Sequence, residues 1–339
     1  MKKILVLGAT GAMATYLVPL LLEKGMEVTG VSLDEPLLTH PHLCSVRANA
    51  KDKVFLGEAI AKKYDAIVDF MIYDTKEEFE EYYKLFLDNT SHYIFFSTYR
   101  VYAGECPLRE DSLRLLEAQK PDDFVSEREY SIYKAEEEDM LRASGYNNYT
   151  IVRPAITYSD RRFQLTTLEA RILLPRMRSG KTVLLPEGAM DKQATMTWAG
   201  DVAKMLYAIL FNPKAYGETY TVSTAEHHTW REIAEMYGRI GGLKYLAIPD
   251  DEFIALLGGG PYNKQQLKYD RCFNRVVDNS KILSLMGARG EELMPLEKGL
   301  RMEYERLTEE DLARIGFSAA LDANMDAYLR NREENGHAI

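Results

Sequence analysis

A glycine-rich turn between two apolar runs constrains the fold of this chain more than any other stretch. The run Ile4-Leu5-Val6-Leu7 leads into Gly8-Ala9-Thr10-Gly11-Ala12-Met13-Ala14, and a helical segment at 15–24 is followed by a second apolar run at 28–33. A glycine permits a tight turn that a Cβ would obstruct, and the N-terminus of a helix after such a turn can face a phosphate. The pattern predicts a dinucleotide-binding strand–turn–helix–strand unit, and the alternative is an ordinary turn that carries two glycines.

Apolar strands alternate with helices through the first 150 residues. The expected strands cover 28–33, 43–48, 66–71, 93–96 and 149–152, and the expected helices cover 15–24, 51–63, 76–87 and 126–144. The last of these helices has Ser126 as an N-cap and Glu129 three residues later, the spacing of a capping box. Strands that are apolar on both faces and separated by helices are typical of a parallel sheet covered on each side. The predicted fold class is therefore α/β, with a doubly wound parallel sheet.

The periodicity changes after Pro154. Helices are expected at 167–179, 198–211 and 229–239, with short strands at 182–185 and 218–222 between them. No low-complexity linker or internal repeat separates this second part from the first. We expect it to be a smaller mixed α/β part that packs directly on the sheet domain.

Composition excludes several functional classes. The chain has 339 residues and a net charge of −10, which disfavours binding to nucleic acid or to an anionic membrane. Its three cysteines are far apart and odd in number, which indicates a reducing compartment such as the cytoplasm. The glycine turn interrupts the apolar start too early for a secretion signal, and no run is long enough to span a bilayer. No histidine or cysteine spacing predicts a metal site.

Tyr130 and Lys134 are candidate catalytic residues. Positions i and i+4 lie on one face of a helix, so the ammonium is expected beside the phenol, where it would lower the tyrosine pKa. Such a tyrosine can act as a general acid or base near neutral pH. Thr98 follows a buried strand, and its hydroxyl can bond the same substrate oxygen. On spacing alone, a core tyrosine beside a surface lysine is the more frequent outcome, since the chain has 22 tyrosines.

Several motifs, taken in order, resemble the extended short-chain dehydrogenase/reductase superfamily, the NAD-dependent epimerase/dehydratase type. They are the glycine turn, Ser97-Thr98-Tyr99-Arg100-Val101-Tyr102, Tyr130-Ser131-Ile132-Tyr133-Lys134, Val152-Arg153-Pro154, and, more weakly, Thr197 to Ala203 and Asp278-Asn279-Ser280-Lys281. The resemblance covers about 280 residues. It implies a Rossmann-type domain over 1–157, with a return segment near 189–225, a substrate-binding part formed by 158–188 and 226–330, and a tail at 331–339.

The resemblance also implies roles for individual residues. Thr98, Tyr130 and Lys134 would be catalytic, and Thr98, Arg271 and Arg275 would bind a substrate that is a nucleotide sugar. NAD, with NADP as the alternative, would be held by a set of residues along the strand ends: Gly8, Thr10, Gly11, Ala12, Met13, Ser32, Asn49, Phe70, Met71, Tyr130, Lys134 and Pro154. The resemblance further implies a homodimer through the two helices that hold Phe79 and Tyr130. The apolar face of helix 76–87, formed by Phe79, Tyr82, Tyr83 and Phe86, would suit it, although burial within the monomer is the more frequent reason for such a face.

Departures from the family pattern narrow the reaction. Dehydratases place Asp-Glu after the catalytic threonine, whereas Tyr99-Arg100 stand here. Ser32 replaces the acid that holds the adenosine ribose, although Asp34 lies two residues later, and no arginine follows to bind a 2′-phosphate. Asn49 replaces the aspartate that usually touches the adenine. The acids at 136–139 are expected on a solvated helix face, and the arginines at 161, 162, 171, 176 and 178 on exposed helix faces or at a diphosphate.

Three functions remain open. The first is an epimerase that oxidises a sugar carbon transiently and reduces it again, with Tyr130 as the acid/base. The second is a reductase that consumes NADPH on a keto substrate. The third is a non-catalytic nucleotide-binding protein, which the unusual residues Ser32, Asn49 and Phe70 would suit. The substrate cannot be inferred from the chain, because its pocket is assembled from loops.

Overall fold

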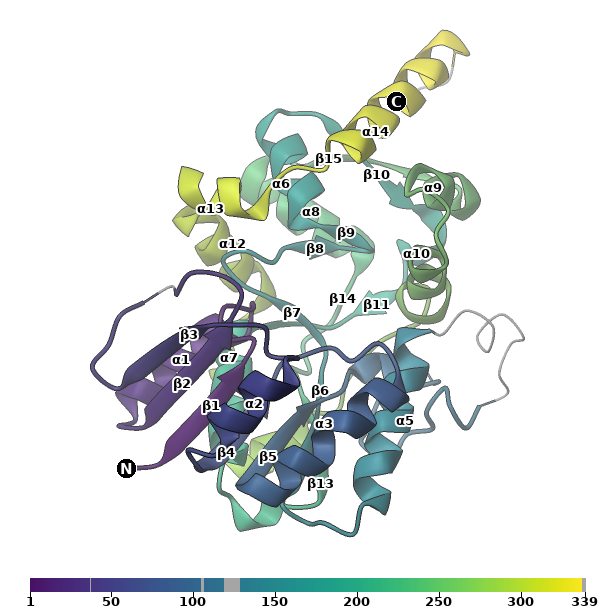
Figure 1. Ribbon diagram of the computed structural model, residues 1–339. Helices are drawn as coiled ribbons and strands as arrows, with labels where there is room; N and C mark the ends of the chain where they lie inside the picture. The colour runs from purple at the N-terminus through teal and green to yellow at the C-terminus, as the bar shows by residue number, and fades with distance from the viewer. Residues whose placement is uncertain (37, 105–106, 119–128, 337–339) are drawn as a thin grey trace.

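The computed structural model describes residues 1–36, 38–104, 107–118 and 129–336, and its main sheet has seven strands. Figure 1 shows this sheet in the lower half of the molecule. The strands are β1 (Lys3–Leu7), β2 (Glu27–Ser32), β3 (Leu43–Arg47), β4 (Tyr64–Asp69), β5 (Thr90–Phe96), β6 (Tyr149–Pro154) and β13 (Glu218–Val222). They lie in the order β13-β6-β5-β4-β1-β2-β3, and every neighbouring pair is parallel. This is the doubly wound Rossmann-type α/β fold that the sequence predicts.

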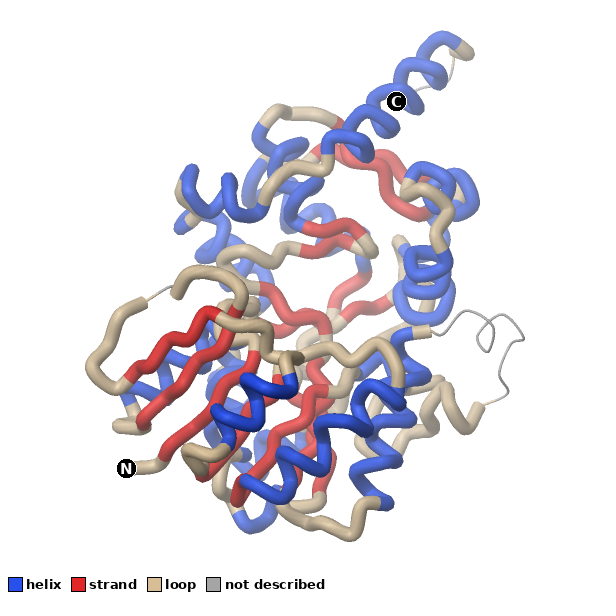
Figure 2. Tube along the Cα trace, viewed as in Figure 1, coloured by secondary structure: helices blue, strands red, loops and turns tan. Residues whose placement is uncertain are grey.

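The alternation of side chains along each strand explains the two helical layers (Figure 2). Ile4 and Val6 of β1 pack in one apolar cluster with α1 (Ala14–Glu23) and α7 (Ala199–Ile209). Leu5 and Leu7 belong to a second cluster, which contains side chains of α2 (Lys53–Ile60), α3 (Lys76–Asn89) and α5 (Tyr130–Ala143). Both faces of the sheet are therefore dry, as expected for strands without a polar face.

Two helices differ in detail from the sequence prediction. Pro19 lies inside α1, which nevertheless continues to Glu23. Helix α5 begins at Tyr130, four residues later than predicted, because the Glu129 carboxylate caps it by accepting the Ser131 N–H. The predicted cap Ser126 lies outside the described residues. Tyr130 is thus the first residue of its helix, next to the cap.

The apolar face of α3 is buried within the monomer. Phe79 stacks on Tyr83 at 5.3 Å and contacts Phe95 of β5 at 4.9 Å, while Phe86 contacts Tyr93 at 5.3 Å. All four predicted aromatic residues are at most 6% exposed. Of the two explanations for this face, packing on the sheet is therefore the one that the structure supports, and the face is not available to a partner subunit.

The second part of the chain lies above the carboxyl ends of the strands (Figure 1). Its strands are β7 (Ile156–Tyr158), β8 (Gln164–Leu165), β9 (Leu168–Glu169), β10 (Thr182–Pro186), β11 (Gln193–Ala194), β12 (Met196–Trp198), β14 (His228–Thr229) and β15 (Lys244–Ile248). Its helices are α6 (Ala170–Arg178), α8 (Trp230–Gly241), α9 (Asp250–Leu256), α10 (Pro261–Gln266), α12 (Leu296–Arg306), α13 (Glu309–Ile315) and α14 (Ala319–Glu334). Helix α11 (Ser280–Met286) packs instead on α7 and β13, and its Ile282 is buried in the same cluster as Ile4 and Val6 of the sheet. Several of these strands have only two or three residues, too short for a sequence period to reveal.

The return segment joins the two parts. Within it, β12 pairs with β7, α7 packs on α1, and β13 adds the last strand beside β6. At the other end of the chain, α14 continues to Glu334 and projects away from the body (Figure 1), so helical structure replaces the start of the tail expected at 331–339.

Candidate active site

A cleft of about 560 Å³ lies between the carboxyl ends of the strands and the second part of the chain. Its walls include Gly11 after β1, Phe70 after β4 and Thr98 after β5, with Tyr130 and Lys134 from α5. Open parallel sheets bind ligands at this edge, because the loops that follow the strands meet there. The volume lies within the range of small-molecule sites.

The glycine turn forms one end of this cleft. Gly8 has φ +82°, and a Cβ on it would lie 3.2 Å from the Phe70 Cβ, so both its backbone angle and its surroundings require glycine. The N–H of Gly8 is used by the Val31 carbonyl and that of Gly11 by the Gly8 carbonyl. Ala12 and Met13, at the N-terminus of α1, line the open cleft. The geometry fits a pyrophosphate at a helix N-terminus.

The expected cofactor residues separate into groups. A majority line the large cleft: Gly11, Ala12, Met13, Phe70, Met71, Tyr130, Lys134 and Pro154. Thr10 and Ser32 line a neighbouring hollow of about 280 Å³ between α1 and the β2–β3 edge. Asn49 lines neither space, and its side chain accepts the Lys51 N–H at 3.0 Å. The expected adenine contact of Asn49 therefore has no support in the geometry.

An acid and an arginine meet at this smaller hollow. The Asp34 carboxylate accepts the Thr10 hydroxyl at 2.9 Å and the Ser32 hydroxyl lies 2.6 Å from the same threonine oxygen, so Asp34 folds back onto the glycine turn. No arginine follows Ser32 in sequence, but the fold brings Arg47 of β3 to the hollow, where Glu35 neutralises it at 2.5 Å. The acid needed beside a ribose is thus present two residues after the expected position.

Tyr130 and Lys134 both line the large cleft, one helical turn apart on α5. The sequence predicted that Lys134 lowers the tyrosine pKa. The Lys134 and Arg100 charges do act in that direction, but burial outweighs them, and the pKa of Tyr130 lies above its ordinary value. The predicted direction of the lysine's effect is therefore confirmed, but it does not decide the protonation state, and in the protein without ligand the phenol carries its proton at neutral pH.

Thr98 is held with its hydroxyl hydrogen free to donate. Its Oγ1 accepts the Arg100 N–H at 3.2 Å, and its side chain is only 6% exposed at the wall of the cleft. The side chains of the next two residues, Tyr99 and Arg100, contact buried acids. The Tyr99 hydroxyl lies 3.4 Å from the Asp270 carboxylate, and the Arg100 guanidinium bonds Glu129 at 2.5 Å. No acid therefore stands beside Thr98 in the described part of this loop.

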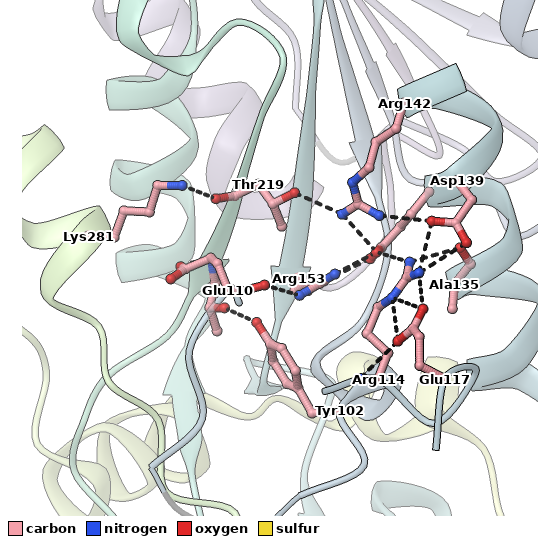
Figure 3. Close-up of polar contacts among 12 residues, drawn as sticks. Tyr102, Glu110, Arg114, Glu117, Ala135, Asp139, Arg142, Arg153, Thr219 and Lys281 are labelled. Atoms are coloured by element: carbon pink, nitrogen blue, oxygen red, sulfur yellow. Dashed lines mark hydrogen bonds and ion pairs between the residues drawn. The ribbon is translucent and has the colours of Figure 1, made fainter. Parts of the chain in front are cut away.

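The acids of α5 are not the solvated face that the sequence predicted. Glu137 and Glu138 are fully buried, whereas Glu136 and Asp139 are partly exposed. Glu138 accepts two hydrogen bonds from Arg153 of β6, at 2.8 Å and 2.6 Å, and Arg114 and Arg142 approach the same group. Figure 3 shows the guanidinium groups of Arg114, Arg142 and Arg153 close together beside α5. Burial alone would raise the Glu138 pKa, but Arg153 overcomes it and lowers the pKa to about 2.

The arginines of the second part have separate roles. Arg271 lines the cleft, and it donates to the Thr166 carbonyl at 2.8 Å and pairs with Asp270. Arg275 is 1% exposed and bonds the carbonyls of Tyr102, Gly104 and Tyr269, so its donors are committed to the fold rather than to a ligand.

The five arginines at 161–178 do not form one cluster. Arg162 lines the cleft, Arg176 is buried against Asp322 and the Thr182 carbonyl, and Arg178 pairs with Glu309 at the surface. Of this group only Arg162 can meet a ligand in the cleft.

Some lining residues were not predicted from the sequence. They come from the turn after β4, from α5 and from the second part: Asp74, Tyr133, Gln164, Glu169, Tyr262 and Gln266. Tyr133 is three residues after Tyr130, and the two rings meet edge to face at 5.4 Å, so helical spacing is a signal that was available for it. The others become neighbours only through the tertiary fold.

Within the described ranges, no group of three or more histidine, cysteine, aspartate or glutamate side chains is arranged to hold a metal ion. The same part of the chain contains no helix that is long and apolar enough to cross a membrane.

Comparisons with known proteins agree with this geometry. The model of the family described as "NAD dependent epimerase/dehydratase family" matches residues 4–223. Among solved structures, an epimerase of Methanothermobacter thermautotrophicus has a TM-score of 0.70 at 13% identity, covering 93% of this chain and 94% of its own. The dTDP-glucose 4,6-dehydratase of Bacillus anthracis, in complex with NAD, has a TM-score of 0.70 at 16% identity, with 93% and 100% covered.

A third structure, the UDP-glucose 4-epimerase of Thermotoga maritima with UDP-glucose, has a TM-score of 0.65 at 17% identity, with 89% and 97% covered. No curated protein matches the chain by sequence. At such low identities the likeness to solved structures establishes the fold.

Proposed function

This chain belongs to the NAD-dependent epimerase/dehydratase family, and from that premise we propose that it is an epimerase of a nucleotide sugar with Tyr130 as its acid/base. The observation that carries the proposal is the convergence of Thr98, Tyr130 and Lys134 on one cleft that opens at the glycine turn. These three residues come from the loop after β5 and from α5, so only the folded chain brings them to the same space.

The residues of the cleft fit the cofactor of this family, which is NAD. The turn at Gly8 and the N-terminus of α1 would hold the pyrophosphate, Asp34 would accept the adenosine ribose hydroxyls, and Phe70, Met71 and Pro154 would line the nicotinamide end. An acid at the ribose favours NAD over NADP, because a 2′-phosphate would meet a negative charge.

Bound NAD supplies a reversible hydride acceptor. The chain's own residues would manage the proton: the Tyr130 phenolate takes it from a sugar hydroxyl when that carbon is oxidised and returns it when the carbonyl is reduced. Thr98 donates to the same oxygen, since its acceptor position is used by the Arg100 N–H. Lys134 favours the phenolate by its charge. Inversion follows when the keto sugar presents its other face before reduction.

The loop after Thr98 disfavours a dehydration that uses acids at that position. Tyr99 and Arg100 stand there, and both are bound to the buried acids Asp270 and Glu129. A carboxyl group that could protonate a departing hydroxyl is therefore missing among the described residues next to Thr98. A nucleotide sugar as substrate is supported by the neighbours with such ligands and by Arg162 and Arg271 in the cleft.

One observation favours a second candidate, the reduction of a keto substrate. In the protein without ligand the Tyr130 phenol keeps its proton, because burial raises its pKa. A protonated phenol is the form that donates to a developing alkoxide, which is the only direction that a reductase needs. An epimerase must also use the phenolate form.

Turnover of a panel of UDP-, dTDP- and GDP-sugars, followed by proton NMR, tests the proposal. The epimerase account predicts interconversion of two epimers without net change in the absorbance of reduced nicotinamide, and its loss in Tyr130→Phe. Tyr207→Phe, on α7 and away from the cleft, is the matched control. Net oxidation of added NADPH would instead establish the reductase, and unchanged turnover in Tyr130→Phe would exclude Tyr130 as the acid/base.

A further inference from the structure

The floor of the cleft contains a buried polar cluster that the proposed reaction does not explain. The Lys134 ammonium lies 2.8 Å from Oε2 of Glu137, one turn further along α5, and both side chains are at most 1% exposed. The other carboxylate oxygen of Glu137 is buried and has no hydrogen-bond partner among the residues that the structure describes. Asp69, at the end of β4, is also buried and belongs to the same cluster. The positive charge of Lys134 acts to lower the pKa of Asp69, against the larger effect of burial, and the negative charge of Asp69 acts to raise the pKa of Glu137.

The hydrogen bonds distinguish the two buried carboxyl groups. Asp69 accepts three donors, the hydroxyls of Tyr73 and Tyr93 at 3.0 Å and 2.8 Å and the Met71 N–H at 3.0 Å. Glu137 accepts a hydrogen bond from one described residue, Lys134. Burial raises the pKa of both carboxyl groups. Donors stabilise a carboxylate, and Asp69 has more of them, so of the two groups Glu137 is the one that holds a proton more readily.

The charge balance leads to the same residue. Lys51 pairs with Glu78 at 2.9 Å at the edge of the cluster, which leaves Lys134 as the cation that Asp69 and Glu137 share within the described part of the chain. One ammonium cannot neutralise two buried carboxylates, and a buried uncompensated charge is costly. The cluster becomes neutral when one carboxyl group takes up a proton.

We propose that Glu137 is a positioning residue: its carboxyl group fixes the Lys134 ammonium in the floor of the cleft and, by gaining or losing a proton, sets how much of that charge acts on the Tyr130 phenol. This role rests on the proposed function of Tyr130 and Lys134. An ionised Glu137 cancels part of the lysine's field at the phenol, whereas a protonated Glu137 leaves it undiminished.

The titratable groups around Glu137 come from every element packed against it. They are Lys134, Tyr130 and Tyr133 on α5, Asp69 on β4, Tyr73 after it, Glu78 on α3 and Tyr93 on β5. Burial, with the charges of Asp69 and Glu78, outweighs Lys134 and raises the Glu137 pKa to about 7. The negative charge of Glu137 in turn raises the pKa of Tyr130.

The first test needs no turnover. Carbon-13 NMR of the glutamate carboxyl groups in the whole protein should show one titration near pH 7 that disappears in Glu137→Gln and persists in Glu136→Gln, its partly exposed neighbour. In Lys134→Met the midpoint should move upward, because the stabilising cation is gone. A Glu137 carboxyl that titrates in the ordinary range, or one that ignores Lys134→Met, would overturn the inference. If Glu137→Gln does not fold, Glu137→Asp removes the same glutamate signal.

The second test measures kcat/KM against pH for the wild type, Glu137→Gln and Glu136→Gln. Glutamine keeps an acceptor for Lys134 but removes the negative charge that raises the Tyr130 pKa. The rise of kcat/KM with pH, which requires the Tyr130 phenolate, should therefore move to lower pH by about one unit. A rise that stays at the same pH in a folded Glu137→Gln variant would contradict the role assigned to Glu137. If no nucleotide sugar is turned over by the wild type, the proposed function fails, and the NMR titration still decides whether Glu137 holds Lys134.

Discussion

Glu138 and Arg153 join helix α5 to strand β6 through two buried hydrogen bonds, 2.8 Å long from Nε and 2.6 Å long from Nη2. The pair holds the helix that carries Tyr130 and Lys134 at a fixed position beside the end of β5, where Thr98 lies. Neither residue lines the cleft, so its contribution to the site is through position alone.

Removal of one partner should destabilise the protein strongly. Glu138→Gln leaves the buried Arg153 guanidinium without a counter-charge, and we expect a loss of about 3–5 kcal/mol in the free energy of unfolding. Chemical denaturation measures it, with Glu136→Gln as the control, for which the loss should stay within about 0.5 kcal/mol because that acid is partly exposed. A double replacement by Met at 138 and 153 should recover part of the loss, and equal losses in the Gln variants at 136 and 138 would contradict this account.

The same pair predicts how stability depends on acid. The pKa of Glu138 is about 2 in the folded protein and about 4.5 in the unfolded chain, so the unfolded state binds the proton more readily. The stabilisation is complete above about pH 4.5 and is lost as the pH falls toward 2. Urea denaturation between pH 6 and 3 should therefore show a decline of stability that is shallower in Glu138→Gln. Parallel curves would show that Arg153 does not lower the carboxyl pKa.

Gly8 allows the backbone strain and the contact with Phe70 to be tested separately. Gly8→Ala and Gly25→Ala both place a Cβ at positive φ, which should cost each variant about 1–2 kcal/mol of stability. Only at position 8 does the new Cβ meet another group, the Phe70 Cβ at 3.2 Å. Calorimetry should show the NAD dissociation constant raised at least about tenfold in Gly8→Ala and unchanged in Gly25→Ala. If the two variants bind NAD with equal affinity, the glycine turn does not form part of the cofactor site.

Asp34 should set the preference between the two nicotinamide cofactors. Its carboxylate lies at the hollow beside the glycine turn, where a 2′-phosphate would be repelled and Arg47 is neutralised by Glu35. Asp34→Ser should raise the affinity for NADP relative to NAD by about tenfold, which corresponds to about 1.4 kcal/mol. Glu58→Gln, an exposed acid on α2, controls for the net charge. If Asp34→Ser leaves the preference between NAD and NADP unchanged, the adenosine ribose does not bind at Asp34.

Local sequence patterns were sufficient to predict the strands and helices of the sheet domain. They were insufficient to predict which charged side chains near the site are buried. The apolar runs around Gly8 predict β1 and β2, since such strands are dry on both faces. The acids at 136–139 resembled a solvated face, because the partner that buries Glu138 is Arg153, fifteen residues later on a strand. Lys134 and Glu137 have the spacing of a helical ion pair, but only the packed sheet beneath them shows that both are buried.

The second part of the chain was less predictable for a similar reason. Its strands β8, β9, β11 and β14 have two residues each, too few for a sequence period to reveal. The pairing of β11 with β14 also joins Gln193 to Thr229, which are distant in sequence. Arg271 and Arg275 are equivalent in the sequence, whereas in the fold one lines the cleft and the other bonds three backbone carbonyls.

The central claim is that this cleft retains NAD as a recycled cofactor. The most direct measurement is to denature the purified protein and identify any nucleotide that it releases by mass spectrometry. The account predicts NAD close to one per chain, or stoichiometric uptake of added NAD by protein that has lost it. Release of no nucleotide, together with no binding of added NAD, would contradict the account from the glycine turn onward.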